Sequence, residues 1–164
     1  DLRKIWDIIS RMNQMIDDID RRILSVLQRD ATISMDALSE LVHLSRNACW
    51  RRVKQMEEAG ILKDRVALVD PEALGLGLSV FVMIRTASHE PEWLARFEAA
   101  VKTLPEIIGA HRMSGDLDYV LRVRVASVKD YDRFYQRLIE RVPVAEISAS
   151  FVMDDIKDTT ALPT

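Results

Sequence analysis

The sequence predicts an α+β protein in which a short helical region precedes a ferredoxin-like βαββαβ domain. Residues 15–60 contain apolar positions spaced three and four apart, a pattern typical of packed helices. Residues 78–153 contain four apolar or alternating segments typical of strands, which are interleaved with two helical patterns in the order β-α-β, β-α-β. Such an order predicts an antiparallel sheet with both helices on one face.

We divide the chain into five parts. They are an N-terminal extension expected to be helical (1–14), a helix-turn-helix domain (15–60), a wing or linker strand (61–77), a ferredoxin-like domain (78–153) and a C-terminal tail (154–164). The boundary before residue 78 follows from the flexible composition of ALGLG just before it.

The first helix of the helix-turn-helix domain is expected to begin near Asp17. Carboxylates at Asp17 and Asp20 suit the first turn of a helix, where they interact favourably with the helix dipole. Four apolar residues supply its buried face: Ile19, Ile23, Val26 and Leu27.

Residues 34–60, SMDALSELVHLSRNACWRRVKQMEEAG, predict two further helices joined by a tight turn. Leu38, Leu41 and Val42 fall at i, i+3 and i+4 and give the shorter helix an apolar face. Serines stand where each helix should begin, and each can cap a helix N-terminus. Gly60 suits a left-handed helix end.

The longer of these two helices has two opposed sides at about 100° per residue. One side is apolar: Cys49, Val53 and Met56. The opposite side carries hydrogen-bond donors: Asn47, Arg51 and Lys54. Between residues 41 and 56 there are four basic residues and no acidic one. A helix-turn-helix places a helix of this kind in the DNA major groove.

On the residues alone, a solvated helix face explains this basic side as well as DNA binding does. The DNA hypothesis names nine contact residues: Ser34, Ser45, Arg46, Asn47, Ala48, Trp50, Arg51, Lys54 and Gln55. Trp50 has an alternative role, which is to cover the junction of two helices. Arg52 projects about 100° away from Arg51, so we expect it to pair with a carboxylate such as Asp20. Cys49 is expected to be a buried apolar residue rather than a redox-active thiol.

In the ferredoxin-like domain, strands are expected at residues 78–84, 107–113, 119–125 and 147–153. One expected helix spans residues 91–104 and presents Leu94, Phe97, Val101 and Leu104. The other presents Tyr131, Phe134, Leu138 and Val142. Because both helices cover one face of the sheet, its other face needs a partner wherever it is apolar, and a second subunit is the simplest one.

Composition restricts the class of protein. The chain has 164 residues, 48% of them hydrophobic and 30% charged, enough for one large or two small domains. No apolar run approaches ~20 residues and no signal-like segment opens the chain, so we expect a cytoplasmic protein. A single cysteine argues against a disulfide framework and a thiolate metal cage. The net charge of −3 argues against indiscriminate nucleic-acid coating.

Three motifs occur in the order and spacing of a known family: IDRRILSVLQRDATIS, LSRNACWRRVKQMEEAGIL and SGDLDYVLRVRV. Through them residues 15–163 resemble the leucine-responsive/asparagine-regulator (Lrp/AsnC) family of bacterial and archaeal transcription factors. ALVDPEALGLGL, KDYDRFYQRL and DDIKDTTALP are most similar to members that sense L-cysteine and activate its desulfidation. Residues 1–14 lie outside the resemblance.

The resemblance implies a homodimer that pairs through the ferredoxin-like domain and assembles further to a tetramer or octamer. It also implies a small amino acid bound between subunits near the loop MSGDLDY. The effector-binding residues are then Met113, Ser114, Gly115, Asp116, Leu117, Asp118 and Tyr119. A glycine-containing loop with carboxylates can hold an ammonium by charge and a carboxylate by backbone N–H groups. A tight turn is compatible with this role, and which aspartate faces the ligand stays open.

The leading hypothesis is a sequence-specific regulator that binds double-stranded DNA at a near-palindromic operator. L-cysteine is the favoured effector, and leucine or another branched-chain amino acid is the alternative. The rival hypothesis is an enzyme on the same architecture, since siroheme decarboxylases resemble this family in both domains. They need histidines and cations around a large cavity, whereas only His111 lies in the expected sheet. We therefore predict no catalytic residue, no cofactor and no metal site.

Overall fold

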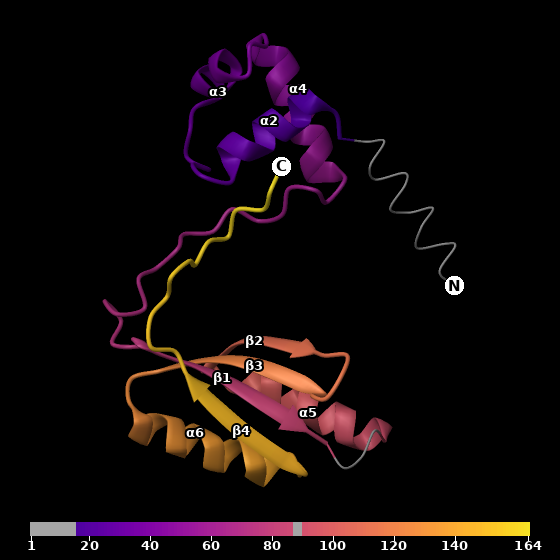
Figure 1. Cartoon of the computed structure of the whole chain (residues 1–164). Helices are drawn as coiled ribbons and strands as arrows, with labels where there is room; N and C mark the ends of the chain where they lie inside the picture. Colours follow the sequence, from indigo (N-terminus) through magenta and orange to yellow (C-terminus); the bar gives the residue numbers. More distant parts are fainter. Residues whose placement is uncertain (1–15, 87–89) are drawn as a thin grey trace. The chain divides into compact units, whose positions relative to one another are not determined.

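The computed structural model describes residues 16–86 and 90–164, and the chain forms two compact units (Figure 1). Of the described residues, one unit contains 16–67 together with 157–164, and the other contains the rest, from 68 to 156. The helix expected at residues 1–14 lies outside the described residues. No helix in the described part of the chain is long and apolar enough to cross a membrane.

The part of the first unit that the structure describes contains three helices: α2 (Asp18–Leu27), α3 (Met35–Leu41) and α4 (Arg46–Glu58). Asp17 caps α2, and its carboxylate accepts the backbone N–H groups of Ile19 and Asp20. The hydroxyls of Ser34 and Ser45 accept the N–H groups of Ala37 and Ala48 and so cap α3 and α4, as the sequence predicts. Eight buried hydrophobic residues make the core: Ile23, Leu24, Leu27, Leu38, Val42, Cys49, Val53 and Met56.

The predicted apolar face of α3 is wrong at one position. Leu38 and Val42 are 1% exposed, but Leu41 is 60% exposed. Ser39 is buried and donates its hydroxyl to the carbonyl of Asp36. The buried face is therefore centred between Leu38 and Ser39, and at about 100° per residue Leu41 falls outside it.

Two backbone positions shape the ends of α3 and α4. His43 adopts φ +58° in the turn between these helices, and Gly60 adopts φ +71° just after α4. Glycine tolerates a positive φ at no steric cost, so Gly60 ends the helix as expected. The next segment differs from the expectation, because residues 61–77 form no strand. Most of its side chains are exposed, and a strand needs a hydrogen-bonded neighbour that this segment does not have in the described structure.

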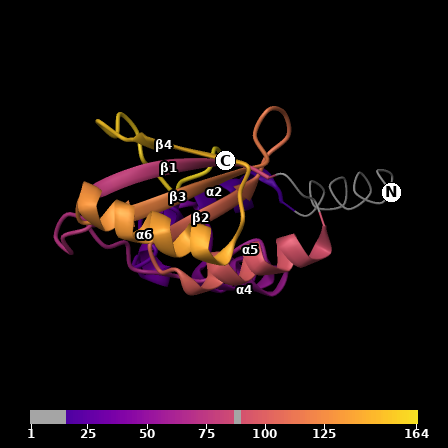
Figure 2. The same cartoon turned by 90° about the horizontal axis from the view of Figure 1, so that it is seen from below.

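The second unit is an antiparallel sheet in the order β2-β3-β1-β4. The strands are β1 (Leu78–Arg85), β2 (Ile107–Arg112), β3 (Tyr119–Val125) and β4 (Glu146–Phe151). Helices α5 (Pro91–Thr103) and α6 (Val128–Arg141) lie on the same side of this sheet in both views (Figures 1 and 2). The α+β architecture with a ferredoxin-like βαββαβ domain is confirmed.

Alternation in β3 places its apolar residues in the core as predicted. Tyr119, Leu121, Val123 and Val125 are all buried, whereas Arg122 is exposed on the opposite face. That opposite face carries Phe81, which is 39% exposed, and neither α5 nor α6 covers it.

Two other expectations for this domain need correction. The buried residues of α5 are Trp93, Phe97 and Ala100, while Leu94 is 38% exposed, because the indole packs parallel to the Phe97 ring and rotates the buried face. Met153 is 95% exposed, because β4 ends at Phe151.

The C-terminal tail packs on the helical unit, which the sequence does not indicate. The side-chain amide of Gln28, at the end of α2, forms two hydrogen bonds with one tail residue. Its Nε2 donates to the Leu162 carbonyl at 3.2 Å, and its Oε1 accepts the Leu162 N–H at 2.6 Å. The C-terminus accordingly lies beside α2 (Figure 1).

Candidate DNA-binding surface and effector loop

The polar side of α4 is open to solvent. Asn47, Arg51 and Lys54 are all exposed, while the apolar side of the same helix packs into the core of the unit. Gln55 is also exposed and lies at the margin of the polar side. The two opposed sides that the sequence predicts for this helix are therefore present.

Trp50 does not cover the junction of the helices, because 54% of its surface is exposed. It lies one turn from Asn47 and one turn from Lys54, so its ring borders the polar side of α4. Ser34, Ser45 and Ala48 are placed at or near helix N-termini, where backbone N–H groups favour an anion such as a phosphate.

Two of the basic residues have carboxylate partners on the same surface. Arg46 Nε lies 3.0 Å from Asp36 Oδ1, and Lys54 Nζ lies 2.8 Å from Glu57 Oε2. The bond from Lys54 lowers the pKa of Glu57, which also accepts a bond from Arg65. Exposed pairs of this kind contribute at most about 1 kcal/mol, so a phosphate can replace the carboxylate. Arg51 has no ion pair with any residue that the structure describes.

Arg52 anchors α4 to α2, which confirms the predicted partner. Its Nη1 donates to Asp20 Oδ1 at 2.9 Å and to Asp17 Oδ2 at 2.7 Å. Asp20 is 6% exposed, so this guanidinium neutralises a buried carboxylate. The bonds to Asp20 and Asp17 raise the pKa of Arg52. The pKa of Asp17 is lowered first by the N–H of Asp20 and further by Arg52.

The predicted effector loop connects β2 to β3 and is held by hydrogen bonds at both ends. The Met113 N–H donates to the Asp118 carbonyl at 2.8 Å, and the Asp118 N–H donates to the Ile84 carbonyl at 3.1 Å. Gly115 adopts φ +113°, a conformation that only glycine accepts readily. Met113, Ser114, Gly115 and Asp116 are exposed, and Leu117 is half-buried.

The two aspartates of the loop have different surroundings. One carboxylate oxygen of Asp118 accepts the Thr86 N–H at 2.8 Å, and the residue is half-buried. Asp116 is exposed, and its backbone carbonyl accepts a hydrogen bond from Arg85 Nε at 2.7 Å. Asp118 therefore shapes the loop, while the carboxylate of Asp116 is accessible from solvent.

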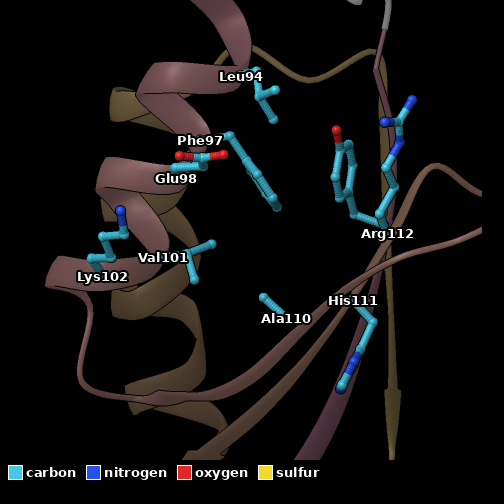
Figure 3. Close-up of a pocket in the computed structure, with 9 residues that line it drawn as sticks. Leu94, Phe97, Glu98, Val101, Lys102, Ala110, His111 and Arg112 are labelled. Carbon is cyan, nitrogen blue, oxygen red and sulfur yellow. The ribbon is translucent and has the colours of Figure 1, made fainter. Parts of the chain in front are cut away.

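Tyr119 follows the loop but its ring lies in the core. The residue is 7% exposed, and its ring centroid is 4.5 Å from that of Phe97. The ring forms part of the wall of a cavity of about 340 Å³ between α5 and the sheet (Figure 3). The other lining residues are Leu94, Phe97, Glu98, Val101, Lys102, Ala110, His111 and Arg112.

This cavity adjoins the loop, since Arg112 and Tyr119 flank residues 113–118 in the chain. Phe97 and Val101 project into it from α5, and Ala110 faces them from β2 (Figure 3). Sequence patterns did not predict the cavity, because Glu98 and Lys102 resemble any solvated residues of a surface helix.

The structure shows no metal-binding arrangement in the residues it describes, since no three His, Cys, Asp or Glu side chains gather there. Cys49 is fully buried, and desolvation raises the pKa of its thiol. A thiol in that environment is a poor nucleophile, which agrees with the expected packing role.

The fold and these surfaces define a helix-turn-helix protein with a ferredoxin-like second domain. Residues 16–63 match the family model for a winged helix-turn-helix DNA-binding domain, and residues 79–162 match the Lrp/AsnC ligand-binding domain. The chain belongs to the Lrp/AsnC family and is a DNA-binding transcriptional regulator.

Curated relatives match nearly the whole chain. The DNA-binding transcriptional activator DecR of Escherichia coli is 49% identical over 150 residues, covering 91% of this chain and 99% of the relative. The glutamate uptake regulatory protein of Zymomonas mobilis is 47% identical over 152 residues, covering 93% of each.

Solved structures show the same fold. An AsnC family transcriptional regulator from Agrobacterium tumefaciens superimposes with a TM-score of 0.87 at 47% identity, covering 90% of this chain and 97% of that one. A Neisseria meningitidis transcriptional regulator in complex with L-Met gives 0.86 at 34% identity, covering 90% and 96%.

Proposed function

We propose that this regulator binds the DNA major groove with the exposed side of α4. The principal contacts would be Asn47, Arg51 and Lys54. The single observation that supports this most is their exposure opposite the packed apolar side of the helix. Arg51 suits a guanine edge and Asn47 an adenine edge, because each can form a bidentate pair in the major groove. Lys54, Arg46 and the capped N-termini suit phosphates.

The test is a titration of the full chain against its own upstream DNA over a salt series. Neutralised phosphates release counterions, so log affinity should fall steeply with log salt. Arg51→Ala should weaken binding by about 1–3 kcal/mol at the preferred site if it makes a bidentate base contact. Lys129→Ala changes an exposed lysine of α6 outside this surface and is the matched control. A flat salt dependence, or unchanged binding in Arg51→Ala, would contradict the proposal.

We propose further that two copies act together on a near-palindromic operator. Neither α5 nor α6 covers the sheet face that carries Phe81, which is 39% exposed, and an uncovered sheet face with an exposed aromatic side chain suits a subunit interface. A dimer would place two α4 helices in successive major grooves, about 10 bp apart. Phe81→Glu should convert the dimer, and any tetramer or octamer built from it, to monomers in sedimentation. Unchanged mass in that variant would argue for another interface.

For the effector we propose a small amino acid bound at the loop of residues 113–118 and the adjoining cavity. The side chain of the amino acid would enter the cavity, where Phe97 and Val101 are apolar. Asp116 would hold its ammonium, because the Asp118 carboxylate already accepts the Thr86 N–H. The L-Met complex of the related Neisseria regulator supports an amino-acid ligand.

L-cysteine is our first choice of effector, on the resemblance of three segments to cysteine-sensing regulators. Leucine or another branched-chain amino acid is second, and the names of relatives add L-glutamate and L-methionine to the panel. Calorimetry with these ligands tests the choice. Asp116→Asn should weaken binding, while Asp132→Asn, an exposed change on α6, should leave it unchanged. If the protein bound leucine but not cysteine, the cysteine proposal would be wrong, whereas the assignment as a transcriptional regulator would be unaffected.

We do not propose an enzyme. Relatives that match nearly the whole chain carry the names of transcriptional regulators, and a siroheme decarboxylase would need a cavity for a tetrapyrrole. The cavity beside α5 has a volume of about 340 Å³, at the small end of the range for ligand pockets, and the other hollows described in the structure reach about 500 Å³. A red-shifted siroheme spectrum on mixing, or release of CO₂, would revive the enzyme hypothesis. Because the proposed partner is genomic DNA, we place the protein in the cytoplasm.

A further inference from the structure

Trp50 exposes a large apolar indole to solvent, which is energetically unfavourable. More than half of its surface, 54%, is open to solvent, whereas Trp93 is 6% exposed and fully integrated in its core. A tryptophan side chain contributes a large apolar area, which is favourable only when it is covered. It borders the polar side of α4, one turn from Asn47 and one turn from Lys54. The partner that covers the indole should therefore be the partner of the polar side.

The major groove offers an indole one kind of apolar partner. Each base pair presents hydrogen-bond donors and acceptors there, and the largest apolar group on a base edge is the C5-methyl of thymine. We propose that Trp50 recognises thymine by contact with this methyl group. The inference rests on the DNA-binding surface proposed above and adds a specificity-determining residue to it.

Asn47 also favours an A·T pair, because it can bind the adenine that lies opposite a thymine on the other DNA strand. An asparagine pairs with the N6 and N7 atoms of adenine, whose partner base is thymine. Residues one turn apart on a helix have Cβ atoms about 5–6 Å apart, close enough to address the same or neighbouring base pairs. Trp50 and Asn47 together therefore favour A·T pairs at one position or two adjacent positions in each half-site.

An alternative use of the indole is as a hydrogen-bond donor, because its Nε1–H can reach a base acceptor or a phosphate. Replacement of thymine by deoxyuridine separates the two uses. It deletes the methyl group and leaves every hydrogen-bonding atom of the base in place.

The experiment begins with binding sites selected from random duplexes by the full chain. Each thymine of a selected site is then replaced singly by deoxyuridine, and the affinity is measured for the wild type and for Trp50→Ala. Burial of one methyl should give a loss of about three- to fivefold at one thymine per half-site in the wild type. Trp50→Ala should bind the unmodified site more weakly and show no further loss at that thymine.

Two variants control the measurement. Arg51→Ala should lower overall affinity yet keep the deoxyuridine penalty, because the indole is still present. Trp50→Phe should keep part of the penalty. Since Trp50 is exposed, Trp50→Ala should unfold at the temperature of the wild type.

A wild-type protein that binds its selected sites with no deoxyuridine penalty would overturn the inference. So would an equal penalty in wild type and Trp50→Ala, because another residue would then contact the methyl. Failure to bind any duplex would overturn the DNA-binding surface itself along with this inference, so the two failures are distinguishable.

Discussion

The two compact units of this chain are stabilised by different means. The second unit, residues 68–156, matches a ligand-binding domain and is called the sensor unit below; its described residues include fourteen buried hydrophobic side chains and all the ring contacts of the described chain. Among its described residues, 16–67 and 157–164, the DNA-binding unit buries eight hydrophobic side chains, none of them aromatic. It adds a buried carboxylate that is neutralised by Arg52, and its helices α2, α3 and α4 each begin with a side-chain cap.

The comparison shows how a small domain can present a polar recognition surface and keep its shape. With fewer apolar contacts available, the packing of Cys49, Val53 and Met56 of α4 is supplemented by directional bonds from Arg52 to α2. The sensor unit instead depends on packing against a sheet, so its helices need only apolar faces. Loss of one large side chain should therefore damage the sensor unit, and loss of one ion pair should damage the DNA-binding unit.

The largest effect is expected from Phe134→Ala in the sensor unit. Phe134 is 0% exposed on α6, and its truncation should cost about 3–5 kcal/mol of unfolding free energy. Urea denaturation followed by circular dichroism measures the loss. Leu94→Ala, at a residue 38% exposed on α5, is the matched control and should cost much less. Similar losses in the two variants would show that packing is not what holds this unit.

A smaller effect is expected from Arg52→Ala in the DNA-binding unit. The change leaves Asp20, 6% exposed, without its cationic partner. Arg52 is itself partly exposed, so the cost should be about 1–3 kcal/mol, less than for a fully buried pair. Arg46→Ala removes an exposed pair and should cost at most about 1 kcal/mol. If Arg52→Ala and Arg46→Ala lowered the unfolding free energy equally, the bonds from Arg52 to α2 would stabilise the unit no more than an exposed ion pair does.

Acid should weaken the DNA-binding unit through Asp17. The Asp20 N–H, and then Arg52, hold the pKa of Asp17 below its usual value in the folded chain. The stability that Asp17 contributes is therefore present above its unfolded pKa of about 4 and is lost as pH falls through the lower folded value. Denaturation at a series of pH values between neutral and acidic measures this slope. Asp17→Asn should reduce the slope of unfolding free energy against pH. If the slope were unchanged in this variant, other carboxylates would cause the acid sensitivity.

The smallest effect is expected from the tail. A chain that ends at Ile156 loses both hydrogen bonds between Gln28 and Leu162. These bonds are exposed, so the loss should stay within about 1–2 kcal/mol, measured as a shift in thermal unfolding. Gln28→Ala should reproduce the loss, and the combined variant should show no more than either alone. If the losses of stability in the truncated chain and in Gln28→Ala were additive, the tail would stabilise the unit through contacts other than those with Gln28.

Much of the fold could be predicted from the sequence because the relevant signals are local. Alternation in β3 assigned Leu121 and Val123 to the core, and helical spacing assigned Phe134 and Leu138. The opposed sides of α4 were predictable for the same reason, since a regular helix converts spacing directly into direction. Exposure of Asn47 and Arg51 followed from that geometry.

Errors arose where a neighbour decides which of two similar faces is buried. Leu41 and Leu94 both fit their helical patterns, yet Ser39 and Trp93 occupy the buried positions instead. Amphipathic patterns define a face only to within about one residue, and packing against another element selects the final rotation.

The sequence by itself determined the order of the elements, the side of α4 that faces solvent and the position of the loop of residues 113–118, because each depends on residues close together in the chain. Three features were decided by the tertiary structure alone. They are the hydrogen bond from the Thr86 N–H to the Asp118 carboxylate, the position of the cavity beside α5, and the contact between Gln28 and the C-terminal tail. These features join residues far apart in the chain, and no local pattern of side chains records which distant backbone group a polar side chain will meet.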